Sequence, residues 1–400
     1  MSYPYESKIL TRLGVRSWIN ACNWSTTLGG TWLPKEVNDA MEEVSKTFVK
    51  IDELIDKAGS RIAELCQVDA AFVTTGAAGG IELSVAASMT GKDTAKIRRL
   101  PDTTGMKNEV VMHRGHSTFY DPQWTAAGAK LIYYGAAGYL RCSQQELEDV
   151  ITDQTCCLAY VNSYHTTPRG IIPIEGVVKV AQKYQLPVIV DTASILPPVA
   201  NLHKFADAGA DISIFSGGKG IRGPNDTGLI LAKGKRGVEL IEAIKLFASP
   251  SGGWGRAFKV SKEQIVGLVV ALEIFVKEGD KWYEQQMRTA KYIADQLRDI
   301  SGFEVDIIPN DETFHEHPVS PHVPRVRVQW NTNELKLTPE EVDAAMAKED
   351  PPVILRSGIY FNPLTNKASR LIDTYFLREG EEVIVAERLR RILLAHKAPP

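Results

Sequence analysis

The sequence predicts an α/β fold in which a largely parallel sheet is covered by helices on both faces. From residue 70 onward, short apolar segments typical of buried strands alternate with segments of helical periodicity. Such alternation indicates βαβ units, whose parallel strands are joined by helices that pack on the sheet. The 400 residues, of which 44% are hydrophobic and 24% charged, suffice for two globular domains.

The individual elements follow from the spacing of apolar side chains. Residues 34–66 have apolar positions three and four apart, which predicts helix, with Gly59 as a candidate break. Strands are then predicted at 71–74, 110–113, 130–134, 157–162, 188–191, 211–215, 228–232, 303–308 and 323–330. Further helices are predicted at 77–90, 143–152, 174–184, 202–208, 261–275, 283–300 and 381–396.

The chain is predicted to contain a large and a small domain. The segment Ser249-Pro-Ser-Gly-Gly-Trp-Gly255 has the composition of a loop and indicates a boundary. We expect residues 46–258 to form the large domain and residues 259–400 a smaller C-terminal α/β domain. Residues 1–45 are expected to be an N-terminal segment associated with the small domain.

Composition argues against several classes of protein. The net charge of −3 argues against a general nucleic-acid binder, which would need a basic face. No apolar run approaches the ~20 residues of a membrane span, and the first residues lack a secretory signal pattern. The five cysteines are odd in number and have no metal-ligand spacing. We therefore expect a cytoplasmic protein without a nucleic-acid or membrane partner.

Two polar residues stand where predicted strands end. Asp191 ends the run Leu186-Pro-Val-Ile-Val-Asp191, and Lys219 follows Phe215 after a Ser-Gly-Gly turn. A pyridoxal phosphate site requires such a pair, because a lysine forms a Schiff base with the cofactor aldehyde and an aspartate pairs with the protonated pyridine nitrogen. Taken singly, Lys219 is better explained as a solvated loop residue than as a cofactor ligand, and Asp191 as a residue that caps a turn or helix. Their order and shared position at strand ends favour the cofactor site.

A glycine-rich turn precedes this pair in the sequence. Thr74-Thr-Gly-Ala-Ala-Gly-Gly80 follows a predicted strand and opens a helix. The N-terminus of a helix offers free N–H groups and the positive end of its dipole to a phosphate. Taken alone, the segment is better explained as an ordinary turn than as a phosphate site, and it lacks the spacing of a P-loop. Ahead of the Asp and Lys pair, we predict that the phosphate is bound by Thr75, Gly76, Ala77 and Ser216.

Imidazole groups follow another predicted strand. A ring at this position would lie over the cofactor's pyridine ring, and we predict His116 in that role, with His113 and Tyr120 behind it. A hydrogen-bonded structural histidine explains His116 nearly as well.

The segment Asn162-Ser-Tyr-His165 ends a further predicted strand. Asn162, Ser163 or His165 would contact the ring oxygen of the cofactor. The alternative, about as well supported, is a turn without a functional role.

Two arginines are candidates for binding anions. Arg356, in the predicted small domain, is expected to bind a substrate carboxylate, because a guanidinium group pairs with carboxylates in bidentate fashion. A surface arginine is the more common explanation. Arg256 is a second candidate that would reach the cofactor site of a neighbouring subunit. His315 and His317 precede a proline and lack a third ligand, so we expect an exposed loop and no metal site.

At these residues the chain resembles fold-type I pyridoxal phosphate enzymes, which have the aspartate aminotransferase-like fold. Within them it is similar to the branch of the bacterial selenocysteine synthases. The resemblance covers roughly the whole chain, and it implies that Lys219 carries the cofactor and that Asp191 binds its ring nitrogen. It also places His116 at the branch's ring-stacking position. The matching segments are Leu186–Asp191, Phe215–Pro224, Ile19–Ala21, Gly76–Gly79 and Arg114–Gly115.

The chain also departs from that branch. The tRNA-dependent members carry an extra N-terminal tRNA-binding domain, whereas this chain begins almost directly at Ile19-Asn-Ala21. It therefore looks more like the shorter, ammonia-lyase members. Cys22-Asn-Trp24 replaces the small Gly-containing stretch expected there, so the substrate is not inferred from the resemblance.

We predict a homodimeric, pyridoxal phosphate-dependent lyase that acts on a small polar amino acid. Once the substrate amine has displaced it, Lys219 would act as general base for the α-proton. A β-leaving group would then depart, giving a keto acid and ammonia. Racemisation or epimerisation shares the first step and requires a second acid, for which His116, His165 and Tyr120 are candidates. Aldol cleavage and transamination are further alternatives, and a cofactor-free α/β binding protein is the alternative of another class.

Overall fold

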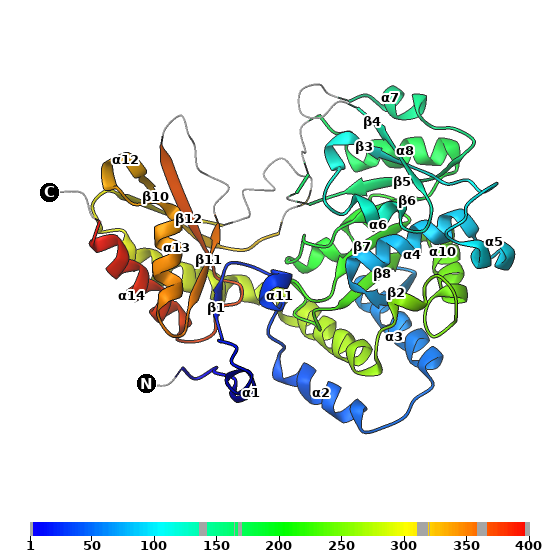
Figure 1. Cartoon of the computed structure of the whole chain (residues 1–400). Coiled ribbons are helices and arrows are strands. Elements are labelled where there is room, and N and C mark those ends of the chain that lie inside the picture. The colour runs from blue at the N-terminus through cyan, green and yellow to red at the C-terminus, as the bar shows by residue number, and fades with distance from the viewer. Residues whose placement is uncertain are drawn as a thin grey trace. The chain divides into compact units, whose positions relative to one another are not determined.

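The computed structural model describes residues 3–135, 142–163, 165–166, 170–309, 319, 321–357 and 366–396. These residues divide into two compact units (Figure 1). The larger unit contains the described residues of 30–279, with Val319 and Pro321. The smaller unit contains residues 3–29, 280–309 and those described from 322 to 396.

The larger unit is built on one sheet. Among the described residues this sheet has seven strands in the order β2-β8-β7-β6-β5-β3-β4. Only β8 runs antiparallel to its neighbours, and the predicted, largely parallel sheet is thus confirmed. The strands are β2 (Ala70–Thr75), β3 (Glu109–His113), β4 (Lys130–Tyr134), β5 (Thr155–Val161), β6 (Val188–Asp191), β7 (Ile212–Ser216) and β8 (Thr227–Ala232).

Helices cover both faces of this sheet. Gly80 of α4 approaches one face so closely that a Cβ there would lie 2.7 Å from Cγ2 of Ile214. On the other face, Phe205 of α9 contacts Tyr160 with 6.0 Å between ring centroids. The helices and 3-10 turns of this unit are α2 (Lys35–Ser45), α3 (Ile51–Cys66), α4 (Gly76–Thr90), α5 (Thr94–Arg99), η2 (Arg114–His116), α6 (Asp121–Thr125), α7 (Gln144–Asp149), α8 (Ile174–Tyr184), η3 (Val199–Leu202), α9 (Lys204–Asp207), α10 (Gly234–Phe247) and η4 (Arg256–Phe258).

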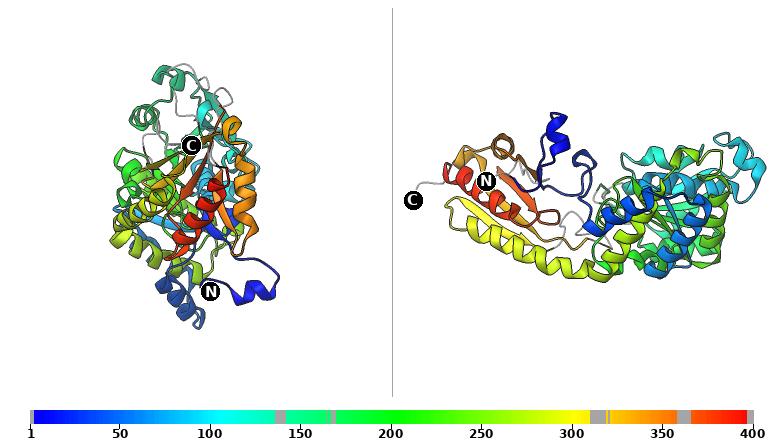
Figure 2. Two further views of the ribbon diagram at one scale, coloured as in Figure 1. Left: turned by 90° about the vertical axis from the view of Figure 1, so that its left-hand side faces the viewer. Right: turned by 90° about the horizontal axis from the view of Figure 1, so that it is seen from below.

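Two predicted helix boundaries were wrong. The helical pattern at 34–66 breaks between α2 and α3 rather than at Gly59. Gly59 lies within α3, where a Cβ would meet the carbonyl oxygen of Ala71 at 2.5 Å, so this glycine permits close packing and does not end the helix. The patterns at 261–275 and 283–300 form a single helix, α11 (Lys262–Leu297), which Figure 2 shows without interruption.

The units divide at positions other than the expected 45/46 and 258/259. The division lies at 29/30 and within α11, at 279/280. Nζ of Lys262 donates to the Val44 carbonyl oxygen at 2.8 Å, and a Cβ on Gly267 would lie 2.8 Å from Sδ of Met41. These contacts hold α2 and the first half of α11 together in the larger unit.

The smaller unit is built on a mixed sheet. Its described strands have the order β1-β11-β12-β10-β9, with β1 parallel to β11 and the others antiparallel. An apolar core lies between this sheet and the C-terminal half of α11, α13 and α14. The elements are α1 (Lys8–Arg12), β1 (Ile19–Ala21), η1 (Thr26–Leu28), β9 (Phe303–Ile308), β10 (Arg325–Asn331), α12 (Thr332–Leu335), α13 (Pro339–Lys348), β11 (Val353–Ser357), β12 (Lys367–Asp373) and α14 (Glu381–Leu394).

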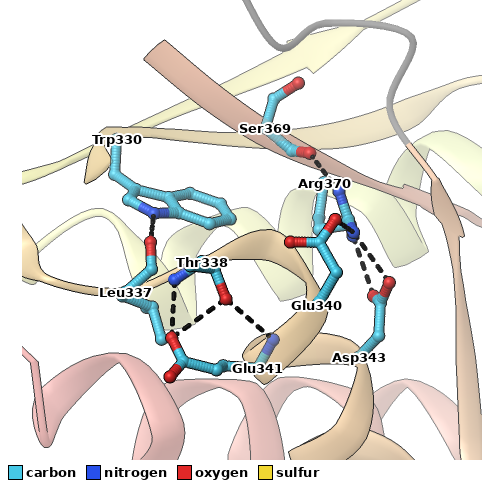
Figure 3. A network of polar contacts seen from close by, with 8 residues as sticks. All are labelled: Trp330, Leu337, Thr338, Glu340, Glu341, Asp343, Ser369 and Arg370. Carbon is cyan, nitrogen blue, oxygen red and sulfur yellow. Dashed lines mark hydrogen bonds and ion pairs between the residues drawn. The ribbon is translucent and has the colours of Figure 1, made fainter. Parts of the chain in front are cut away.

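A polar network fixes α13 against this sheet (Figure 3). The buried guanidinium group of Arg370 on β12 donates to both carboxylate oxygens of Asp343 on α13, at 2.8 and 2.7 Å. Thr338 and Glu341 form a capping box at the start of α13. A bidentate pair of this kind sets the orientation of the helix as well as stabilising it.

Candidate active site

The candidate residues of the larger unit gather at one edge of its sheet. The strands β2, β3, β5, β6 and β7 run in the same direction, since β2 and β7 are both antiparallel to β8. Ligands of such sheets bind beyond the C-terminal ends of the strands. The residues that end these strands or directly follow them include Thr75, His113, Asn162, Asp191 and Ser216.

Asp191 and Lys219 lie within electrostatic reach of each other at this edge. Burial raises the pKa of the Asp191 carboxyl, an effect that a hydrogen bond from the Ala193 N–H and the positive charge of Lys219 partly offset. Burial lowers the pKa of the Lys219 amine, and Asp191 opposes that shift. The Lys219 residue nevertheless remains partly accessible. An amine that loses its proton easily and can still be reached is suited to covalent and proton-transfer chemistry.

Glycines allow the turn before Lys219 to pack closely on residues 225–227. A Cβ on Gly218 would lie 2.3 Å from Cα of Asn225, and a Cβ on Gly217 would lie 2.1 Å from Oγ1 of Thr227. The Gly217 N–H donates to the carbonyl oxygen of Thr227 at 2.8 Å. Only glycine permits this approach, and the Ser-Gly-Gly sequence before the lysine therefore has a packing reason.

The N-terminus of α4 lies at the same edge and has no side-chain cap. Thr75 is the N-cap residue but makes no capping hydrogen bond, and Gly76 has φ +58°. The fully buried hydroxyl of Thr74 has no hydrogen-bond partner among the described residues. The Gly76 N–H donates to the Asp226 carbonyl oxygen at 2.9 Å. The N–H groups that follow it, at the positive end of this 15-residue helix, have no side-chain cap and can bind an anion.

His116 and Asn162 are buried beside these groups. Nδ1 of His116 accepts the Val161 N–H at 3.4 Å, and its ring packs edge-on against Tyr160 with 4.5 Å between centroids. The Asn162 N–H donates to the Asp191 carbonyl oxygen at 3.0 Å, and its Nδ2 donates to the Val319 carbonyl oxygen at 2.7 Å. Its buried Oδ1 has no partner among the described residues.

The other predicted site residues are placed less centrally. The rings of Tyr120 and His165 lie near each other, with 6.1 Å between centroids, and both residues are exposed. Arg256 is exposed on η4, and Ser216 is partly exposed at the end of β7. Arg356 is buried on β11 in the smaller unit. Burial raises the pKa of the Cys22 thiol, and the charge of Arg356 partly offsets that rise. His315 and His317 lie outside the described residues.

The arrangement fits pyridoxal phosphate. The amine of Lys219 suits the cofactor aldehyde, and the carboxyl of Asp191 suits its ring nitrogen. The uncapped start of α4 suits the phosphate, while the unpartnered Oδ1 of Asn162 is a buried polar atom that a ligand would satisfy. Gly228 was missed by the sequence analysis, because only the strand register brings it beside Gly76.

The described residues contain neither a metal-binding cluster nor a membrane-spanning helix. No group of three or more His, Cys, Asp or Glu side chains within the described ranges is placed to hold a metal ion. None of the described helices is long and apolar enough to cross a membrane.

Comparison with known proteins identified relatives along the whole chain. The family model for aminotransferase class-V matches residues 111–326. D-glucosaminate-6-phosphate ammonia lyase of Salmonella typhimurium is 31% identical over 96% of this chain and 97% of its own. A solved structure of a D-glucosaminate-6-phosphate ammonia-lyase has a TM-score of 0.80 at 30% identity and covers 98% of this chain and 99% of its own.

Two further relatives have other activities. A 5'-C-glycyluridine monooxygenase-decarboxylase of a Streptomyces species is 32% identical over 75% of this chain and 73% of its own. The L-seryl-tRNA(Sec) selenium transferase of Caldanaerobacter subterraneus subsp. tengcongensis is 25% identical over 62% of this chain and 54% of its own. The predicted fold type I, its pyridoxal phosphate cofactor and the similarity to the selenocysteine synthase branch are thereby confirmed.

Proposed function

The chain belongs to the aminotransferase class-V family of pyridoxal phosphate-dependent enzymes, and from this premise we propose that it is an ammonia-releasing lyase. Its substrate would be a polar amino acid with a hydroxyl or similar leaving group on the β carbon. The observation that carries the proposal is the 31% identity to an ammonia lyase over 96% of the chain, with Asp191 and Lys219 paired at the expected sheet edge. The predicted lyase class agrees with that relative's activity.

The cofactor, when bound, supplies an electron sink that stabilises negative charge at the substrate's α carbon. Lys219 would hold it through its aldehyde and Asp191 through its ring nitrogen. Thr75, Gly76, Ala77 and Ser216 would bind its phosphate, mainly through the N–H groups at the start of α4.

Lys219 would also transfer protons. Burial lowers the pKa of its amine, so the neutral form that can accept the substrate's α-proton is more accessible than for a solvated lysine. The β-hydroxyl would leave as water, and water would return when the product is hydrolysed to a keto acid and ammonia. The atoms of the amino acid are thus divided between two products without an oxidant or reductant.

Other residues have proposed roles around this centre. His116 would lie against the cofactor ring, Asn162 would contact its ring oxygen, and His165 and Tyr120 would serve as acids or substrate contacts. Arg356 would bind the substrate carboxylate. Arg256 would serve the site of a second subunit in a homodimer, and we propose a cytoplasmic location.

The test begins with covalent attachment. The purified protein is mixed with pyridoxal phosphate, reduced with borohydride and mapped by mass spectrometry, with Lys219→Ala as the control. We expect one adduct, on Lys219, and none in the variant. If the wild-type protein forms no adduct there, the proposed site is wrong.

The second stage distinguishes the reactions. D-glucosaminate-6-phosphate, serine and other β-hydroxy amino acids are incubated with the loaded protein, and ammonia, keto acid and stereochemistry are measured. Equal amounts of ammonia and keto acid are expected. Inversion at the α carbon without ammonia would instead identify a racemase or epimerase, and release of an aldehyde together with a shorter amino acid would identify an aldolase.

A further inference from the structure

The turn that carries Lys219 ends in an unusual backbone conformation. Arg222, three residues after the lysine, has φ +59°, in the left-handed region that favours glycine. Its N–H donates to the carbonyl oxygen of Lys219 at 3.0 Å and closes the turn. The residue that closes the turn after Lys219 therefore adopts its backbone conformation at a steric cost.

A distant segment lies against this turn. The guanidinium carbon of Arg222 is 4.7 Å from the ring centroid of Trp32, which is a cation–π geometry. Two residues earlier, a Cβ on Gly30 would lie only 2.0 Å from Oδ1 of Asn225. Residues 30–32 thus pack on the segment from Lys219 to Asn225, although about 190 residues separate the two segments in the sequence.

We propose that Trp32 is a positioning residue for Lys219, because its ring holds the side chain of Arg222 and thereby the left-handed backbone that closes the lysine's turn. The proposal rests on the proposed function, in which Lys219 binds the cofactor. Trp32 itself touches neither cofactor nor substrate in this account. It stabilises a conformation that an arginine at position 222 would otherwise leave easily.

This account makes Trp32 necessary only while residue 222 is not glycine. Glycine adopts positive φ without the steric cost that a Cβ imposes, so Arg222→Gly would keep the turn closed without help from the indole ring. Arg222→Ala would keep the cost and lose the cation–π contact. The two substitutions at one position therefore separate the backbone effect from the loss of charge.

The experiment uses the full-length protein freed of cofactor. It compares the wild type with Trp32→Ala, Arg222→Ala, Arg222→Gly and the double variant Trp32→Ala with Arg222→Gly. One readout is the acetylation of Lys219 by limiting acetic anhydride, measured by mass spectrometry relative to Lys235, whose side chain is 92% exposed. The other is the dissociation constant for pyridoxal phosphate.

We expect Trp32→Ala and Arg222→Ala each to raise Lys219 acetylation and to weaken cofactor binding by about two- to fivefold. Arg222→Gly and the double variant are expected to stay near the wild type in both readouts. If Trp32→Ala had the same effect in the wild-type background as in the Arg222→Gly background, the proposal would be overturned. If Trp32→Ala does not fold, equal behaviour of Arg222→Ala and Arg222→Gly would overturn it as well.

Failure of the proposed function looks different. In that case the wild-type protein forms no borohydride-stable adduct on Lys219. The acetylation of Lys219 in the cofactor-free variants still reports whether Trp32 sets the position of its side chain.

Discussion

The carbonyl oxygen of Gly76 lies only 2.2 Å from the position that a Cβ on Gly228 would occupy. Gly76 is the first residue of α4, and Gly228 lies on β8, the strand that pairs with β2 and β7. The same Cβ would lie 3.0 Å from the nitrogen of Ala77. The absence of a side chain at position 228 is therefore what allows the start of α4, the proposed phosphate site, to sit against the sheet.

Gly228→Ala should weaken cofactor binding, because the backbone at the start of α4 must shift to admit the methyl group. We expect a rise of about tenfold or more in the dissociation constant for pyridoxal phosphate and a loss of about 1–3 kcal/mol in stability. Gly252→Ala is the control, since a Cβ there meets nothing within 4 Å and the residue has no positive φ. Unchanged cofactor binding in Gly228→Ala would contradict the phosphate assignment.

Asp191→Asn should reduce the catalytic rate by about 10²-fold or more, because an amide does not hold a proton on the cofactor's ring nitrogen.

The stability of the Asp191→Asn variant should respond differently from its rate. Burial raises the pKa of Asp191, so the ionised carboxyl destabilises the fold progressively as the pH rises from 3.8 through the folded-state pKa. Asparagine lacks this charge, and the free energy of unfolding at neutral pH should not fall by more than about 1 kcal/mol. Rate assays and urea unfolding at pH 7 check both parts.

His113→Asn should flatten the dependence of stability on pH. His113 is fully buried, Nδ1 accepts the Gly115 N–H at 3.0 Å, and burial lowers its pKa below 6.5. As the pH falls, His113 therefore binds a proton at a higher pH in the unfolded chain than in the folded protein. Stability from this group is complete above pH 6.5 and is lost as the pH falls through the folded-state pKa. Between pH 7 and 5, urea unfolding should show a smaller decline in the free energy of unfolding for the variant than for the wild type. An identical decline in both proteins would mean that other groups cause it.

Asp373→Ala should destabilise the smaller unit strongly. Its carboxylate accepts from Nε of Arg325 at 2.8 Å, and both side chains are 1% exposed, so the variant removes one member of a buried ion pair. The expected loss is about 3–5 kcal/mol. Glu304→Ala is the matched control, because its pair with Lys367 is largely exposed and should contribute less than about 1 kcal/mol. Similar losses in both variants, measured by denaturant unfolding, would contradict this difference.

The strands of the larger unit were predictable because most of them are buried on both faces. Such strands appear in the sequence as short, continuous apolar runs, and the fully buried β6 has the bounds that the pattern predicts. The edge strand β4, which is only partly buried, also has its predicted bounds. The smaller unit was harder. Its strands β1, β11 and β12 and its helix α13 were not predicted, because their short apolar patterns are interrupted by polar residues such as Arg356, Arg370 and Asp343.

The sequence by itself determined the fold class. It also singled out Asp191 and Lys219, because Asp191 ends one recognisable apolar run and Lys219 follows another after a Ser-Gly-Gly turn. The tertiary structure decided how their surroundings are built. It brought Gly228 beside Gly76 and Trp32 onto the turn after Lys219. These pairs are joined by packing between segments far apart in the chain, and local periodicity carries no information about which segments meet.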